Sequence, residues 1–130
     1  MATLLVIEDE APLRANIVRL LTAEGYRVIA AADGDEGIRR AREDRPDLVI
    51  CDILMPRVDG YGVLATLRSQ PETAATPFIF LTASADKEDL ERGLQSGAND
   101  YVTKPFRIAD LLAAIRRGLP PDGRGASVEE

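Results

Sequence analysis

Five short apolar runs alternate with five segments of helical pattern, and this alternation limits the possible folds more than any other feature of the sequence. Residues 4–7, 48–51 and 78–81 are continuously apolar, as is typical of strands covered on both faces. A strand–helix unit repeated five times predicts an α/β domain in which a parallel sheet lies between two layers of helices. The predicted strands are 4–7, 28–31, 48–51, 78–81 and 101–102, and the predicted helices are 13–21, 35–43, 61–69, 87–95 and 108–119.

The length and the apolar runs define the expected domain and its location. The chain has 130 residues, of which 45% are hydrophobic, and this suits one domain with an ordinary core, which we place at 1–119. Residues 120–130 lack periodicity and are expected to form a flexible tail or the start of a linker. No run approaches the roughly 20 apolar residues of a membrane span, and no secretory signal pattern is present. We therefore expect a cytoplasmic protein without membrane contact.

The charge and the rare residue types exclude several kinds of chemistry. The net charge of −6 argues against direct binding of nucleic acid by this domain. The absence of histidine excludes histidine-based catalysis and most zinc sites. The single cysteine, Cys51, lies in an apolar run and is expected to be a buried core residue.

Polar side chains follow four of the predicted strands. Glu8 and Asp9 follow the first strand, Asp52 the third, Thr82 the fourth, and Lys104 comes shortly after the fifth. In open parallel sheets the functional crevice lies beyond the carboxyl ends of the strands. We therefore expect these side chains to meet at one edge of the sheet.

Each of these residues also has an ordinary structural explanation. Asp9 could cap the first helix, Thr82 could be a strand-end hydroxyl, and Lys104 could be a solvated charge. Asp52 is harder to explain in this way, because the apolar residues before it draw its backbone into the core.

Three carboxylates crowded together would raise one another's pKa values unless a cation lay among them. Oxygen ligands without histidine or thiolate suit Mg²⁺, which commonly binds one or two carboxylates together with a phosphoryl oxygen. A phosphoryl group would also account for Lys104 and Thr82 as partners of its anionic oxygens. One carboxylate would then remain to accept the phosphoryl group as an aspartyl phosphate.

Four segments, "LLVIEDE", "LVICDILMPRVDGYGVL", "PFIFLTAS" and "GANDYVTKPF", give the chain a family resemblance over residues 3–119. In their order and spacing they resemble the receiver domain of two-component response regulators. The resemblance implies a flavodoxin-like, doubly wound (βα)5 sandwich of three layers, with a parallel five-stranded sheet of order 2-1-3-4-5.

The resemblance also implies roles for individual residues at the metal site. Asp52 corresponds to the phospho-acceptor, and Asp9, Asp52 and the backbone carbonyl of Leu54 correspond to the protein ligands of Mg²⁺. Glu8 would bind the ion through water, and Mn²⁺ can substitute for Mg²⁺.

Other residues correspond to the switch of the family. Thr82 matches the hydroxyl that turns toward the phosphoryl group, and Ala83 is a small neighbour that leaves the group accessible. Lys104 matches the phosphoryl-binding lysine, with a cis peptide bond to Pro105. Tyr101 matches the aromatic residue that rotates inward, although an amphipathic residue on an edge strand is an alternative explanation.

The implied function is that of a phosphorylation-driven switch in a two-component or phosphorelay pathway. A sensor histidine kinase or a histidine phosphotransfer protein would donate the phosphoryl group to Asp52. The fourth helix, fifth strand and fifth helix would then present the changed state to a downstream output domain or protein. Such a domain is a signalling switch rather than an enzyme, and it catalyses only its own phosphorylation and slow dephosphorylation.

Two residues depart from the common family pattern. Glu8 replaces the more usual aspartate of the acidic pair, a change that the family tolerates. Ala114 stands where regulators that dimerise through the last helix carry an interfacial arginine, so we do not expect dimerisation through that ion-pair network.

Three alternatives remain at this stage. A phosphatase of the haloacid dehalogenase type needs a second aspartate two residues after the first, where this chain has Leu54. A flavodoxin-type flavin module needs a hydroxyl- and glycine-rich phosphate loop, where Glu8 and Asp9 would repel phosphate. A receiver-like interaction module that is never phosphorylated would be expected to lack one of the site residues, and none is missing.

Overall fold

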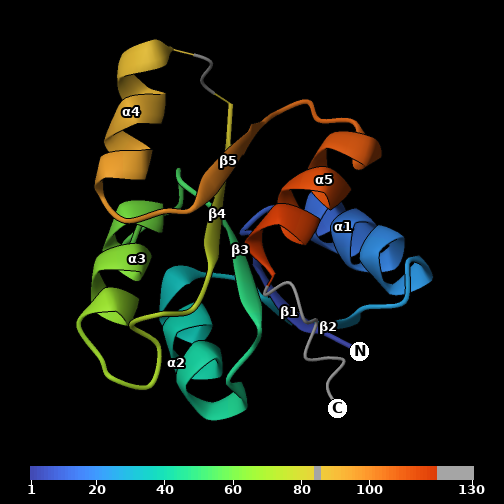
Figure 1. Ribbon diagram of the computed structural model, residues 1–130, viewed down its shortest axis with the longest axis horizontal. Coiled ribbons are helices and arrows are strands. Elements are labelled where there is room, and N and C mark those ends of the chain that lie inside the picture. Colours follow the sequence, from blue (N-terminus) through green and yellow to red (C-terminus); the bar gives the residue numbers. More distant parts are fainter. Residues whose placement is uncertain (84–85, 120–130) are drawn as a thin grey trace.

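The computed structural model describes residues 1–83 and 86–119, so the predicted tail at 120–130 lies outside the described residues. Five strands and five helices alternate along the described chain, as the sequence predicts (Figure 1). The elements are β1 (Thr3–Ile7), α1 (Ala11–Ala23), β2 (Arg27–Ala31), α2 (Gly34–Asp44), β3 (Leu48–Asp52), α3 (Gly60–Arg68), β4 (Phe78–Thr82), α4 (Lys87–Gln95), β5 (Asp100–Thr103) and α5 (Ile108–Gly118).

The strands form one parallel sheet in the order β2-β1-β3-β4-β5. Figure 1 shows α1 and α5 on one face of this sheet and α2, α3 and α4 on the other. The predicted three-layer, doubly wound fold is therefore confirmed. The β1–β3 pairing aligns Ile7 with Cys51, which brings the residues after both strands to the same edge.

The continuously apolar strands fill two separate cores. Leu4 and Val6 face the cluster formed with α1 and α5, whereas Leu5 and Ile7 face the cluster formed with α2 and α3. Because successive side chains in a strand point to opposite faces, a strand buried on both faces must be apolar at every position. Cys51 is fully buried, and burial raises the pKa of its thiol, as expected of a core cysteine.

Aspartate side chains begin three of the helices. Asp33, Asp59 and Asp86 each accept a hydrogen bond from a backbone N–H in the first turn of α2, α3 or α4. The helix α1 differs, because its N-cap residue is Glu10, whose side chain makes no cap hydrogen bond with the described residues. The alternative role of Asp9 as the cap of this helix is therefore wrong.

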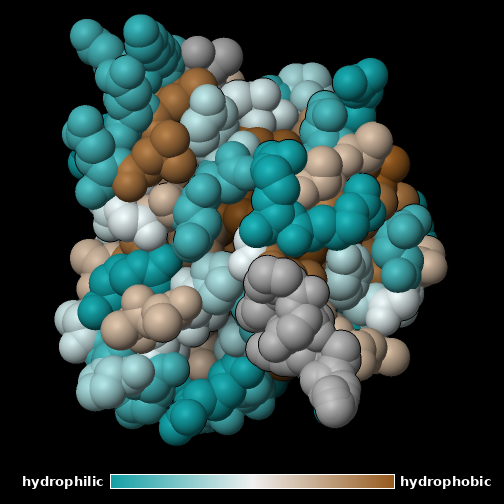
Figure 2. All heavy atoms as spheres, viewed as in Figure 1, coloured by the Kyte–Doolittle hydropathy of each residue, from teal (hydrophilic) through white to brown (hydrophobic). Residues whose placement is uncertain are grey.

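The helix α4 is the least buried helix of its layer. Its single buried residue is Gly93, and the side chain of Leu94 is 43% exposed. Figure 2 shows apolar surface along α4 among hydrophilic residues. None of the helices in the described part of the chain combines the length and hydrophobicity of a transmembrane span.

Candidate functional site

The acidic residues predicted at the sheet edge do lie together. Glu8, Asp9 and Asp52 each offer a carboxylate oxygen, and these oxygens all lie within 4.8 Å of one another. Glu8 and Asp52 are buried, with 1% and 7% of their surface exposed, whereas Asp9 is exposed. The arrangement follows from the register, since β1 and β3 are neighbours and Ile7 is aligned with Cys51, so that the next residues, Glu8 and Asp52, lie at the same level.

Lys104 brings a positive charge to this cluster from the segment that follows β5, an edge strand of the sheet. Its Nζ lies 3.1 Å from Glu8 Oε1 and 3.3 Å from Asp52 Oδ1. Its backbone N–H donates to the carbonyl of Thr82, which ties the segment after β5 to the end of β4. The peptide bond between Lys104 and Pro105 is cis, as expected from the family resemblance. The alternative of a solvated lysine charge is wrong, because this ammonium contacts two carboxylates.

The surroundings of Glu8 favour its neutral, protonated form. Burial, followed by the charge of Asp52, raises the pKa of Glu8 to about 7, although the backbone N–H of Glu10 and the ammonium of Lys104 lower it in part. Burial alone lowers the pKa of Lys104, but the carboxylates of Asp52 and Glu8 outweigh this effect and the net pKa is raised. The single ammonium, which contacts two of the three carboxylates, thus offsets only part of their charge.

This charge balance is the test of whether a cation fits. Three carboxylates and one ammonium leave a net charge of −2 when all are ionised, which a divalent ion would neutralise. The donors are oxygens, which are the ligands that Mg²⁺ prefers. The residues present therefore fit a hard divalent cation.

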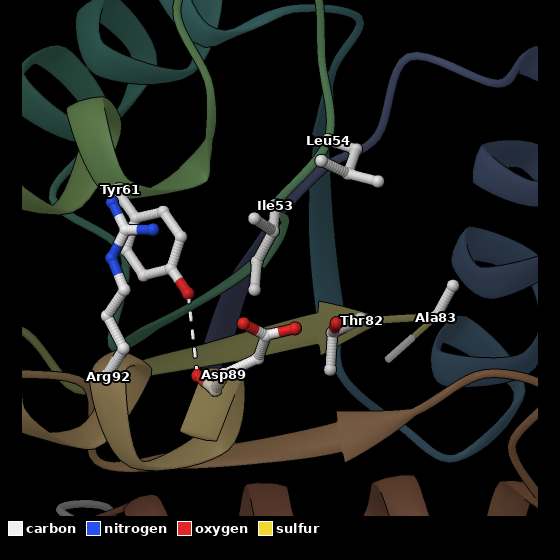
Figure 3. Close-up of a pocket in the computed structure, with 7 residues that line it drawn as sticks. All are labelled: Ile53, Leu54, Tyr61, Thr82, Ala83, Asp89 and Arg92. Atoms are coloured by element: carbon white, nitrogen blue, oxygen red, sulfur yellow. Dashed lines mark hydrogen bonds between the residues drawn. The ribbon is translucent and has the colours of Figure 1, made fainter. Parts of the chain in front are cut away.

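Thr82 and Ala83 line a cavity of about 330 Å³ beside the acidic cluster. Figure 3 shows Thr82 and Ala83 at one end of this cavity and Tyr61 and Arg92 at the other. Thr82 is 5% exposed, whereas Ala83 is exposed. The cavity is completed by Ile53, Leu54 and Asp89.

Leu54 and Tyr101 occupy positions compatible with their predicted roles. Leu54 follows the end of β3, and its side chain is 76% exposed. Tyr101 lies on the edge strand β5, where it is paired with Phe80 and packs against the core cluster on that face. The roles of the Leu54 carbonyl as a ligand and of Tyr101 as a rotating residue stay predictions.

Sequence reasoning missed two residues near the site. Arg14 donates from Nη1 to the backbone carbonyl of Glu8 at 2.8 Å. A cation in the first turn of a helix opposes the helix dipole, and that mismatch was the available signal. Tyr61, which lies against Arg92 in the cavity, gave no signal because its partner is distant in the sequence.

Comparison with known proteins identifies the family. The profile of the response regulator receiver domain matches residues 4–116. The transcriptional regulatory protein AfsQ1 of Streptomyces coelicolor is 43% identical over 122 residues, which cover 91% of this chain and 53% of that protein. The phosphate regulon transcriptional regulatory protein PhoB of Klebsiella pneumoniae is 37% identical over 113 residues, covering 87% of this chain and 49% of that protein. The chain therefore spans about half the length of these relatives.

Solved structures agree with this assignment. The chemotaxis protein CheY4 of Vibrio cholerae superposes with a TM-score of 0.87 at 33% identity, covering 92% of this chain and 99% of that chain. The receiver domain of the sensor histidine kinase PA1611 of Pseudomonas aeruginosa, solved with a magnesium ion coordinated in its active site cleft, superposes with a TM-score of 0.83 at 37% identity. That match covers 90% of this chain and 96% of the other. From its sequence, its fold and its relatives, the chain belongs to the response regulator receiver domain family.

Proposed function

We propose that Asp52 accepts a phosphoryl group in a reaction that depends on a divalent cation, and that the aspartyl phosphate switches the domain between two states. The observation that carries this proposal is the position of Asp52 between two other carboxylates and the ammonium of Lys104. Asp52 suits the acceptor role better than its neighbours do, because Glu8 is almost fully enclosed and Asp9 lies on an exposed turn. Membership of the receiver family favours this function over the phosphatase and flavin alternatives.

Asp9, Asp52 and the carbonyl of Leu54 would hold the cation, with Glu8 contributing through water. We propose Mg²⁺ as the cation, with Mn²⁺ as a possible substitute. When bound, the cation would offset negative charge on the transferring phosphoryl group. The magnesium ion in the PA1611 receiver domain supports this assignment for a relative of the same fold.

The side chains of the chain itself would perform the transfer. A carboxylate oxygen of Asp52 attacks phosphorus, while the bond from phosphorus to a histidine nitrogen of the donor breaks and its electron pair returns to the imidazole. Lys104 would bind one phosphoryl oxygen through its ammonium, and Thr82 would donate its hydroxyl proton to another. The methyl group of Ala83 leaves the approach to Asp52 open.

The partners and the output follow from the family. We propose that a sensor histidine kinase or a histidine phosphotransfer protein is the donor, and that α4, β5 and α5 present the switched state to an output domain or protein. Thr82 and Tyr101 would couple Asp52 to that face. Because the related transcriptional regulators are about twice as long as this chain, an output domain that follows the receiver would suit the same plan. The receiver itself would occupy residues 1–119, act in the cytoplasm and leave nucleic acid to such a partner.

Charges on α5 support the expectation that this face does not use the family's interfacial arginine. Ala114 is 1% exposed and packs in the core. Arg117 pairs with Asp100 at 2.8 Å, and Arg107 pairs with Asp110 at 3.4 Å, both within the chain.

Intact mass spectrometry with acetyl phosphate and Mg²⁺ tests the proposed phosphorylation. We expect a labile mass increase of one phosphoryl group, which EDTA prevents and Asp52→Ala abolishes. Asp35→Ala, which changes an exposed aspartate on α2, is the matched control and should retain the modification. An unchanged mass in protein that demonstrably binds Mg²⁺ would instead support the alternative of an interaction module that is never phosphorylated.

A further inference from the structure

The turn between β1 and α1 carries two of the three clustered carboxylates. Unlike the helices α2, α3 and α4, however, α1 has no side-chain N-cap hydrogen bond at its start among the described residues. Side chains of Asp33, Asp59 and Asp86 cap α2, α3 and α4, whereas the N-cap residue Glu10 of α1 makes no side-chain cap hydrogen bond in this described segment. Uncapped helix starts leave backbone N–H groups without intrahelical partners and fray more easily. The turn that holds Glu8 therefore needs another restraint.

Arg14 supplies such a restraint. Its guanidinium reaches back from the first turn of α1 and donates to the carbonyl oxygen of Glu8 at 2.8 Å. The donor is charged, so this bond is stronger than an ordinary backbone hydrogen bond. The remaining bonds of Glu8 involve other groups. Its N–H donates to the carbonyl of Ala31, its Oε2 accepts from the N–H of Glu10, and its Oε1 accepts from the ammonium of Lys104.

The carbonyl that Arg14 binds belongs to the peptide unit that joins Glu8 to Asp9. A peptide unit is planar, so fixing the direction of the Glu8 carbonyl also fixes the direction in which the Asp9 Cα leaves it. One hydrogen bond can therefore set the orientation of both carboxylate residues. This explains why a cation is tolerated near the positive end of the α1 dipole.

We propose that Arg14 is a positioning residue for the divalent cation site, and that it acts by holding the Glu8–Asp9 peptide unit so that both carboxylates face Asp52. This inference rests on the proposed function, because it assigns Arg14 a part in building that site. A positioning role and a purely electrostatic role of Arg14 predict opposite changes in cation affinity when the side chain is removed. A nearby positive charge by itself repels a cation, so losing it would strengthen cation binding, whereas losing a positioning bond would weaken it.

Calorimetric titration of wild type, Arg14→Met and Arg14→Lys with Mg²⁺ shows whether the loss of Arg14 weakens or strengthens Mg²⁺ binding. Methionine keeps the length and apolar character of the side chain but loses the charge and the donors. We expect Arg14→Met to weaken Mg²⁺ binding by about ten- to hundredfold, the size of one lost hydrogen bond that involves a charged group. Arg14→Lys should fall between the two, because it keeps the charge and offers a shorter donor. Equal or tighter binding by Arg14→Met would overturn the inference.

Hydrogen exchange in the absence of metal gives a second measure that does not depend on phosphorylation. The amides of Asp9 and Glu10 should exchange faster in Arg14→Met than in wild type. Arg19→Met is the matched control, because Arg19 is an exposed arginine of α1 that bonds only to Asn16 among the described side-chain contacts. It should leave both Mg²⁺ affinity and exchange at these amides unchanged.

The outcomes separate this inference from the proposed function. If wild type binds Mg²⁺ and becomes phosphorylated while Arg14→Met binds with the same affinity, only the role of Arg14 falls. If wild type does not bind Mg²⁺, the proposed function falls and the inference falls with it. If Arg14→Met does not fold, Arg14→Lys provides the test. Because lysine keeps the positive charge, a purely electrostatic role predicts that Arg14→Lys binds Mg²⁺ as wild type does, whereas a positioning role predicts weaker binding.

Discussion

The ammonium of Lys104 lies between Glu8 and Asp52, 3.1 Å from Oε1 of the first and 3.3 Å from Oδ1 of the second. Glu8 and Lys104 follow β1 and β5, and Asp52 is the last residue of β3, so the contact exists only in the folded sheet. Without a bound cation, this ammonium offsets the repulsion between two buried carboxylates. The same position would place it against a phosphoryl oxygen on Asp52.

Lys104→Met should therefore destabilise the metal-free protein but not abolish metal binding. Loss of the ammonium leaves two buried carboxylates without a counter-charge. Because the Lys104 side chain is 21% exposed, we expect the free energy of unfolding in EDTA at pH 8 to fall by about 3 kcal/mol, the lower end for a broken buried pair. Mg²⁺ should restore most of this loss, while labelling by acetyl phosphate should be slowed. Urea denaturation with EDTA and with Mg²⁺ measures both effects. Lys87→Met, at an exposed position of α4, is the control, and equal stability of the two variants in EDTA would contradict this account.

The raised pKa of Glu8 predicts a pH dependence of stability in metal-free protein. Because the pKa of Glu8 rises from 4.5 in the unfolded chain to about 7 in the folded one, the folded state binds this proton more tightly. The stabilisation is complete below pH 4.5 and is lost as the pH rises through 7. Its full size is about 3 kcal/mol. Glu8→Gln is neutral throughout, so its stability relative to wild type should increase over this range and level off above it.

Urea denaturation in EDTA at several pH values between 4 and 8 checks this behaviour. The comparison with Glu8→Gln removes contributions from other titrating groups, which both proteins share. Mg²⁺ should flatten the wild-type curve, since a cation favours the ionised carboxylate. Parallel curves for the two proteins in EDTA would contradict the assignment of the titration to Glu8.

The convergence of the site could be predicted from sequence because it depends on strand ends. In a parallel sheet the carboxyl ends of the strands lie along one edge, so polar residues that follow four apolar strands are expected there together. This expectation does not require detailed knowledge of the strand order or the register. Among the strands, the predicted bounds differ most at β5, which extends from Asp100 to Thr103 rather than over 101–102. Both added residues are polar, so hydropathy could not mark them as strand.

Contacts between distant segments could not be predicted in this way. Arg68 illustrates the limit, because its guanidinium donates to the carbonyls of Thr76 and Gly97, at 2.7 and 3.0 Å, and so joins the loops before β4 and β5. Every residue has a backbone carbonyl, so the sequence does not mark which carbonyls accept hydrogen bonds. In the sequence, an arginine at a helix end also looks the same as a solvent-exposed charge. The weak apolar pattern of α4 has a similar origin, because this helix packs through Gly93, which has no side chain.

Gly60 and Gly62 form a matched pair at the start of α3 that tests the loop around the site. A Cβ on Gly60 would lie 2.5 Å from the carbonyl oxygen of Asp52 and 2.8 Å from the Cα of Ile53, both rigid backbone atoms. Gly60→Ala should therefore displace the loop after β3, cost about 1–3 kcal/mol of stability and weaken Mg²⁺ binding. A Cβ on Gly62 would meet only side-chain atoms, of Val58 at 3.1 Å and Asp59 at 3.6 Å, so Gly62→Ala should change stability by less than about 1 kcal/mol.

Thermal denaturation and Mg²⁺ titration of the two glycine variants distinguish these expectations. Similar losses in both variants would show that the close approach of Gly60 to the Asp52 carbonyl does not shape the site.

Tyr61 attaches α4 to α3 at the end of the cavity opposite Thr82 (Figure 3). The guanidinium carbon of Arg92 lies 4.1 Å from the centre of the Tyr61 ring, and the Tyr61 hydroxyl lies 3.5 Å from the backbone carbonyl oxygen of Asp89. The ring also contacts Phe80 of β4, with 5.2 Å between ring centres. Because α4 buries so little of its own surface, this cation–π contact is a substantial part of its attachment.

Tyr61→Leu should therefore loosen α4 while the core keeps an apolar side chain at this position. A cation–π contact of this kind contributes about 0.5–2 kcal/mol, so hydrogen exchange of the α4 amides should accelerate by roughly two- to thirtyfold, with little change in α1. Tyr26→Leu is the control, since Tyr26 packs against the opposite core cluster. If α4 reads the state of Asp52, a loosened α4 should also reduce the difference in its exchange between phosphorylated and unphosphorylated protein. Unchanged α4 exchange in Tyr61→Leu would show that the Phe80 and Gly93 contact is sufficient to hold the helix.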